Sequence, residues 1–133
     1  MSLTVHRAIL GVSSILQVLI GPQRLWNPQP TFALVGVKLP NDVNVMSEAR
    51  SIGAFMMSSG LVILASAVLS KDTASPWLLV GHVAAVVDYG SFALGRVVGI
   101  SKDGQPSSEI KQGLIVEIIV TVLNLVGLWI LLE

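Results

Sequence analysis

Asp88, Arg96 and Glu117 are the residues of this sequence best suited to chemistry, because each interrupts a segment that is otherwise apolar. An ionised side chain at the centre of a bilayer costs roughly 2.5–3.5 kcal/mol on insertion scales, so it usually serves a function or belongs to a buried ion pair. Two carboxyl groups beside one guanidinium can keep one carboxyl ionised and the other protonated. This combination suits general acid–base catalysis, and an ion pair that only holds the helix register is the alternative.

Helical phase puts the polar residues of each apolar segment on one face. At about 100° per residue, an arc of roughly 120° on the segment near 76–100 contains His82, Asp88, Tyr89, Phe92 and Arg96. The other three apolar segments carry similar stripes, which are His6, Ser13 and Gln17; Glu48, Ser51, Phe55, Ser59 and Ser66; and Glu117, Thr121 and Asn124. Four helices with one polar stripe each predict a bundle with a polar interior.

The composition is that of a membrane protein. Of the 133 residues, 53% are hydrophobic and only 12% are charged, and the mean hydropathy is +0.78. Soluble domains have about 25% charged residues. Spans of roughly 20 residues are expected at about 4–22, 46–70, 76–100 and 109–132. The predicted fold is an all-α, antiparallel bundle of four transmembrane helices in a single domain, 1–133, with a long loop between the first two helices. No signal-peptidase motif follows the first span, so it is interpreted as a retained helix.

Local signals predict where the elements begin and end. Gly21-Pro22 is expected to end the first helix. The stretch "TFALVGVKL" in the loop 23–45 alternates enough to predict a short strand or an interfacial lid. Ser47 is expected to cap the second helix, and Pro76 to occupy the first turn of the third. Ser107 or Ser108 is expected to cap the fourth.

Several classes of partner are excluded by the same composition. The net charge is zero, so no nucleic-acid partner is expected. The chain has no cysteine and only two histidines, which argues against a metal site. It has no glycine-rich phosphate loop, so no cofactor is expected.

Six of the eight Lys and Arg residues fall on the side that holds the loops 23–45 and 101–108: Arg24, Lys38, Arg50, Arg96, Lys102 and Lys111. Cytoplasmic loops carry such an excess, so both termini are expected on the opposite side of the membrane. In a eukaryote this membrane is expected to be that of the endoplasmic reticulum.

Depth counted at about 1.5 Å per residue brings the polar residues together in the cytoplasmic half of the bundle. The expected catalytic residues are Asp88, Glu117, Arg96 and Glu48. The expected substrate-binding residues are Gln17, Tyr89, Phe92, Phe55, Ser59, Thr121 and Trp26. His82 lies deeper, and it is interpreted as a hydrogen-bonded core residue.

Two stretches and one later residue resemble a known family. They are "EARSIGAFMMSSGLVIL" at 48–64, "GRVVGISKDGQPSSEI" at 95–110, and Glu117. The pattern resembles a family of short four-helix membrane proteins of unknown function, and Glu48, Arg50, Arg96, Asp103 and Glu117 match it. The chain is also similar to the small membrane epoxide hydrolases of fungal polyketide pathways, of the aurovertin and citreoviridin type. That resemblance implies opening of epoxides on hydrophobic polyenes.

The predicted function is therefore an intramembrane epoxide hydrolase or epoxide-opening cyclase that acts on a lipophilic substrate from the bilayer. One carboxyl would protonate the epoxide oxygen and the other would activate the nucleophile. An acid–base isomerase, a small proton-coupled multidrug-type transporter and a non-catalytic assembly subunit are the alternatives. A homo-oligomer is compatible with each of them.

Overall fold

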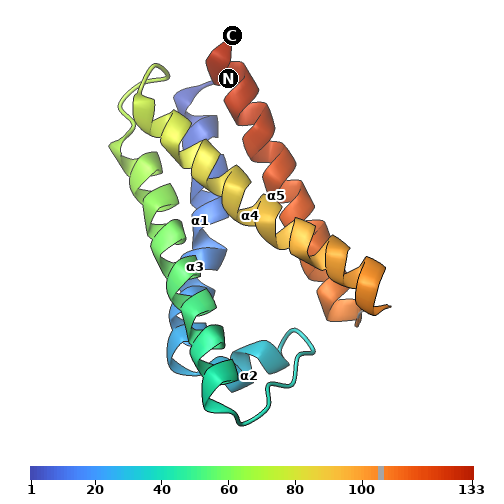
Figure 1. Ribbon diagram of the computed structural model, residues 1–133. Coiled ribbons are helices and arrows are strands. Elements are labelled where there is room, and N and C mark those ends of the chain that lie inside the picture. Colours follow the sequence, from blue (N-terminus) through green and yellow to red (C-terminus); the bar gives the residue numbers. More distant parts are fainter. Residues whose placement is uncertain (105–106) are drawn as a thin grey trace.

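The computed structural model describes residues 1–104 and 107–133, and its regular elements are all helices (Figure 1). In chain order they are α1 (Leu3–Trp26), α2 (Pro28–Ala33), α3 (Val43–Leu69), α4 (Pro76–Asp103) and α5 (Ser108–Leu132). The four long helices are each long and apolar enough to cross a membrane. Consecutive long helices run in opposite directions, and both termini lie at the same end of the bundle (Figure 1). The expected all-α, four-helix fold is confirmed.

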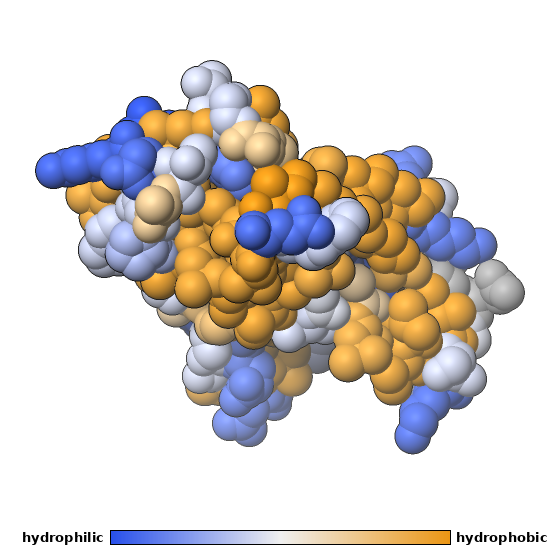
Figure 2. All heavy atoms as spheres, turned by 90° about the horizontal axis from the view of Figure 1, so that it is seen from above, coloured by the Kyte–Doolittle hydropathy of each residue, from blue (hydrophilic) through white to orange (hydrophobic). Residues whose placement is uncertain are grey.

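The outer surface of the bundle is apolar, as lipid contact requires. Large side chains such as Val12, Leu19, Val87, Leu94 and Ile115 are more than half exposed. Seen from the end that carries the termini, hydrophobic residues cover most of the surface, and the hydrophilic residues project in separate groups (Figure 2). The polar side chains inside the bundle are therefore shielded by an apolar shell.

Glycines allow α1 and α3 to pack closely along their length. A Cβ atom on Gly21 would lie 2.5 Å from the backbone nitrogen of Met57, and one on Gly60 would lie 2.6 Å from the Cβ of Gln17. Small residues at such contacts bring two helix backbones together in a membrane, where dispersion contacts replace the hydrophobic effect as the driving force. This packing holds the second half of α1 against α3.

The prediction that α1 ends at Gly21-Pro22 is wrong, because the helix continues to Trp26 with Pro22 inside it. Proline removes one ladder hydrogen bond, but transmembrane helices tolerate it where neighbouring helices support the backbone. The close contact of Gly21 with α3 supplies that support. One further turn of helix carries Arg24 into the bundle.

The predicted strand in the loop 23–45 is also wrong, because Pro28–Ala33 forms the short helix α2. Pro28 at the start suits a helix, and a lone strand would have no partner for its backbone groups. The second long helix starts at Val43, earlier than expected. Its cap is Asp42 rather than Ser47, since the Asp42 carboxylate accepts from the backbone amides of Asn44 and Val45 at 2.9 and 3.2 Å.

The other two helix starts agree with the sequence. Pro76 begins α4, and the Ser107 hydroxyl accepts from the amide of Ile110 at the start of α5.

The four long helices are not packed equally at the two ends. At the end with the termini, Leu10, Ile63, Ala67, Leu78 and Ala85 form the apolar core. Toward the other end, the α1–α3 pair and the α4–α5 pair diverge from each other, and α2 lies beside the α1–α3 pair (Figure 1). We call these the closed end and the open end.

Candidate functional site

Residues from all four long helices line a cavity of about 220 Å³, and its polar residues come from α1, α4 and α5. We call it the polar cavity, and its lining residues are Leu16, Gln17, Ile20, Arg24, Val35, Met56, Tyr89, Phe92, Arg96, Gly113, Val116 and Glu117. Gln17, Arg96 and Glu117 were expected in one site from helical phase and depth. Val35, just beyond α2, adds an apolar contact from the loop between the first two long helices.

Arg96 and Glu117 form an ion pair between α4 and α5. The Arg96 Nε lies 2.9 and 2.8 Å from the two carboxylate oxygens of Glu117, and its N–H donates to both. Gly113, one turn before Glu117, makes this geometry possible, because a Cβ there would lie 3.2 Å from the Arg96 Cζ. The guanidinium therefore lies flat against α5 and holds Glu117 at the wall of the polar cavity.

Arg24 is a buried member of this site that the sequence reasoning missed. Its side chain is only 8% exposed. The guanidinium lies 4.7 Å from the centre of the Phe32 ring, and its Nη1 is 3.1 Å from the Met56 sulfur. Its Nε has no hydrogen-bond partner among the described residues. The available signal was spacing, since Arg24 follows Gln17 by two helical turns and so shares its face, but the expected helix end at Pro22 assigned Arg24 to a loop.

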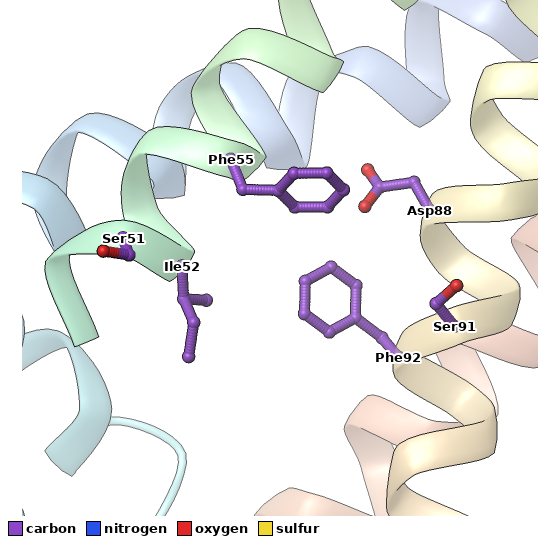
Figure 3. A pocket seen from close by; sticks show the side chains of 6 residues that line it. All are labelled: Ser51, Ile52, Phe55, Asp88, Ser91 and Phe92. Carbon is purple, nitrogen blue, oxygen red and sulfur yellow. The ribbon is translucent and has the colours of Figure 1, made fainter. Parts of the chain in front are cut away.

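Asp88 lies in a second cavity of about 340 Å³ between α3 and α4. We call it the outer cavity, and its lining residues are Ser51, Ile52, Phe55, Asp88, Ser91 and Phe92. Figure 3 shows Phe55 and Ile52 facing Asp88 and Phe92 across this space, with the Asp88 carboxylate pointing toward the Phe55 ring. The Ser59 hydroxyl donates to Asp88 Oδ2 at 2.9 Å. The other oxygen, Oδ1, is buried without a partner among the described residues.

The two carboxyl groups thus have different surroundings. Glu117 is paired with a guanidinium in the polar cavity, whereas Asp88 is bonded to a hydroxyl in the outer cavity. Phe92 lines both cavities, so its ring lies where the two spaces adjoin. The two acids therefore line different cavities with different hydrogen-bond partners, and their close approach to each other stays a prediction.

A separate polar network fills the closed end. His6 Nδ1 lies 2.9 Å from His82 Nε2, and His82 Nδ1 lies 2.8 Å from Asn124 Oδ1. The Asn124 amide donates to the Ser13 hydroxyl at 2.9 Å, and the Tyr89 hydroxyl donates to the Ser13 carbonyl at 2.5 Å. His6, His82 and Asn124 are at most 1% exposed. His82 is therefore a hydrogen-bonded core residue, as its position in the sequence predicted.

Three further residues that the sequence suggested for the site, Glu48, Trp26 and Thr121, line neither cavity. Glu48 is exposed and lines neither cavity, because its position near the start of α3 turns it away from the other helices. Trp26 is 66% exposed at the end of α1. The Thr121 hydroxyl donates to the Glu117 carbonyl within its own helix at 2.7 Å.

The hydroxyl of Tyr89 is occupied by Ser13, so this residue offers the polar cavity its ring. The Asp103 side chain and residues 105–106, which belong to the resemblance pattern, lie outside the described part of the chain.

Within the described ranges, no group of three or more His, Cys, Asp or Glu side chains could hold a metal ion. Comparison with protein families gives one match, described as "Domain of unknown function (DUF4345)", over residues 5–128. No curated protein and no solved structure matches the chain significantly.

Proposed function

This chain belongs to the DUF4345 family, and we propose that it is an intramembrane acid–base enzyme that opens an epoxide on a lipophilic substrate. One observation carries the proposal. Two buried carboxyl groups with different hydrogen-bond partners line adjoining apolar-walled cavities that share Phe92. Acid–base catalysis needs two such groups whose surroundings favour different protonation states.

The roles follow from the partners of each acid. Glu117, held as a carboxylate by Arg96, takes a proton from a water molecule. The water oxygen bonds to one epoxide carbon, and the bond from that carbon to the ring oxygen breaks. Asp88 carries its proton on Oδ1, which is buried without a partner in the described chain, and donates it to the oxygen that is released. The net change is the addition of one water, which gives a vicinal diol. An internal hydroxyl in place of water gives a cyclic ether.

The surroundings of the acids suit this reaction. Leu16, Ile20, Met56 and Val116 line the polar cavity, and Ile52 and Phe55 line the outer one. An apolar wall accepts a hydrocarbon substrate, and exclusion of bulk water strengthens each electrostatic interaction with the developing charge. The Phe92 ring lies where a substrate in contact with both acids would pack.

The transporter alternative has less support from the geometry. Transport requires access to a binding site from both sides of the membrane in turn. At the closed end, Leu10, Leu78, His82 and Asn124 are completely buried and do not line the polar cavity. The cavity is therefore confined to the other half of the bundle.

The test is epoxide opening by the purified protein in detergent. A long-chain polyene epoxide in heavy-oxygen-labelled water should give a diol that carries one labelled oxygen. Asp88→Asn and Glu117→Gln should each lose on the order of 10²–10⁴ in rate, the usual contribution of a positioned proton donor or acceptor. Glu109→Gln, an exposed carboxyl on α5, is the matched control and should keep the rate.

Two results would overturn the proposal. If lipophilic epoxides stay unchanged while reconstituted vesicles exchange protons for a hydrophobic cation, the protein is a transporter. If Asp88→Asn and Glu117→Gln fail to fold, the two carboxyl groups serve to hold the helices together through their bonds to Ser59 and Arg96.

A further inference from the structure

The charges around the polar cavity do not balance. Arg24 and Arg96 contribute two positive charges, and Glu117 contributes one negative charge that is already paired with Arg96. Asp88 does not correct this, because it lines the outer cavity and accepts its hydrogen bond from Ser59. A buried guanidinium is costly without an anion, and a ligand with one negative charge would bring the cavity to neutrality.

Arg24 is placed to receive that anion. The Phe32 ring and the Met56 sulfur hold its guanidinium in position, but neither carries a charge. Its Nε remains an unpartnered donor in a side chain that is more than nine-tenths buried. Guanidinium groups bind carboxylates through charge-assisted hydrogen bonds in a fixed planar geometry. Gln17, another polar residue of this wall, is also buried and has an unpartnered Oε1.

The position of Arg24 indicates an amphipathic ligand. It lies in the last turn of α1, near the membrane boundary, where the anionic group of a lipid is found. Most of the remaining wall is apolar, and the same cavity is lined by Phe92 and Glu117. The volume of about 220 Å³ is below the ~300–1,000 Å³ of a cavity for a drug-sized molecule, so it suits one chain better than the two chains of a phospholipid.

We propose that the polar cavity binds a single-chain lipophilic carboxylate whose carboxylate group pairs with Arg24. This inference rests on the proposed function, because it names the substrate class of the same site: an epoxide-bearing fatty acid or a similar acid, held by its head with the reacting carbons toward Glu117 and Asp88. Arg24 is thus a specificity-determining residue, and it is distinct from the two acids.

The test measures binding of tritiated dodecanoic acid to the purified protein in detergent. Unlabelled dodecanoic acid should compete at least about 10-fold better than methyl dodecanoate or dodecanol, because only the acid offers a charge to a buried guanidinium. Equal competition by the ester would overturn the inference. Better competition by phosphatidylglycerol than by dodecanoic acid would also overturn it, since the site would then take a phospholipid headgroup.

Variants assign the effect to Arg24. Arg24→Gln should reduce the preference for acid over ester to less than about 2-fold, and Arg24→Lys should restore part of it by returning the charge. Lys111→Gln, an exposed cation on α5, is the control and should keep the full preference. A folded Arg24→Gln protein that still prefers the acid would refute the assignment. If Arg24→Gln does not fold, two measurements remain. The native protein must prefer the acid to the ester, and Arg24→Lys must show a smaller preference, or the assignment to Arg24 is refuted.

Carboxylate binding and epoxide opening can be tested separately. Glu117→Gln should lose epoxide opening yet bind dodecanoic acid at least as well as the native protein, since both arginines remain. Acid-selective binding without epoxide opening would overturn only the proposed function. Epoxide opening without any preference for a carboxylate would overturn only the inference.

Discussion

The closed end and the open end of the bundle both have polar interiors, but they satisfy their polar groups differently. At the closed end, each ring nitrogen of His82 has a partner, and the Asn124 side chain bonds to both His82 and Ser13. At the open end, Arg24 Nε and Asp88 Oδ1 are buried without partners in the described chain, and both residues line cavities.

Buried polar groups are nearly always hydrogen-bonded, because an unpaired one costs about 1–3 kcal/mol. A complete network therefore stabilises the structure, whereas unpaired groups at a cavity do not contribute to stability in this way and leave donors and acceptors open at the cavity wall. Substitutions at the closed end should accordingly lower stability, and substitutions at the open end should lower activity.

The largest effect on stability is expected from Gly127→Ala at the closed end. A Cβ atom at this position would lie 2.5 Å from the His82 Cε1, in a core that has no space for it. Overpacking of this kind costs about 1–3 kcal/mol of unfolding free energy. Thermal unfolding in detergent measures the loss.

Gly11→Ala is the matched control, because a Cβ there meets nothing within 4 Å and alanine favours the helix. Equal melting temperatures for the two variants would show that the closed end is not tightly packed.

Arg96→Lys tests the ion pair at the open end. One Nε–H of a planar group is shared between the two oxygens of Glu117, and an ammonium cannot lie flat against Gly113 in the same way. The rate of epoxide opening should fall about 10-fold, with stability nearly unchanged.

Lys111→Arg, the reverse change at an exposed site on the same end, should keep the native rate. A native rate in Arg96→Lys would mean that Arg96 supplies only charge.

Asn124→Ala should weaken the closed end without affecting chemistry. It removes the bonds to His82 and Ser13, and interhelical hydrogen bonds in membranes average about 0.6 kcal/mol each, so a loss of about 1 kcal/mol is expected. The rate should stay within about 2-fold of native at a temperature well below unfolding, and replacement of His82 should likewise cost little activity. A rate that falls while the melting temperature holds would instead connect the network to the site.

The smallest effect is expected from Glu48→Gln. Glu48 was a catalytic candidate by sequence, but its side chain is exposed and lines neither cavity. The rate should change by less than about 2-fold, because the carboxylate contacts neither acid. A loss comparable to that of Glu117→Gln would show that a second copy of the chain brings Glu48 into its neighbour's site.

Helical phase predicted most of the open-end site. Residues four positions apart share a face, so Asp88, Phe92 and Arg96, which follow one another at this spacing, had to lie on one side of their helix. Phase alone could not tell that Asp88 and Glu117 line separate cavities. That separation depends on the angle between α4 and the α1–α3 pair, and this angle is set by contacts between residues distant in the chain.

Arg24 was missed because a local rule predicted the wrong helix end. The rule that proline ends a helix is sound for an isolated helix, because a ladder hydrogen bond is lost. Here the close approach of Gly21 to Met57 supports the backbone, and the helix continues to Trp26. One turn of helix then decides whether Arg24 is a loop cation near the headgroups or a buried guanidinium at the polar cavity.

The sequence by itself determined that this protein is a four-helix membrane bundle with polar residues inside, because span length, hydropathy and the 3.6-residue period act locally. The tertiary structure alone decided which buried polar groups are hydrogen-bonded and which have no partner in the described chain. The physical reason is that a hydrogen bond such as His82 to Asn124, or a missing one at Arg24, depends on the distance between helices that are far apart in sequence.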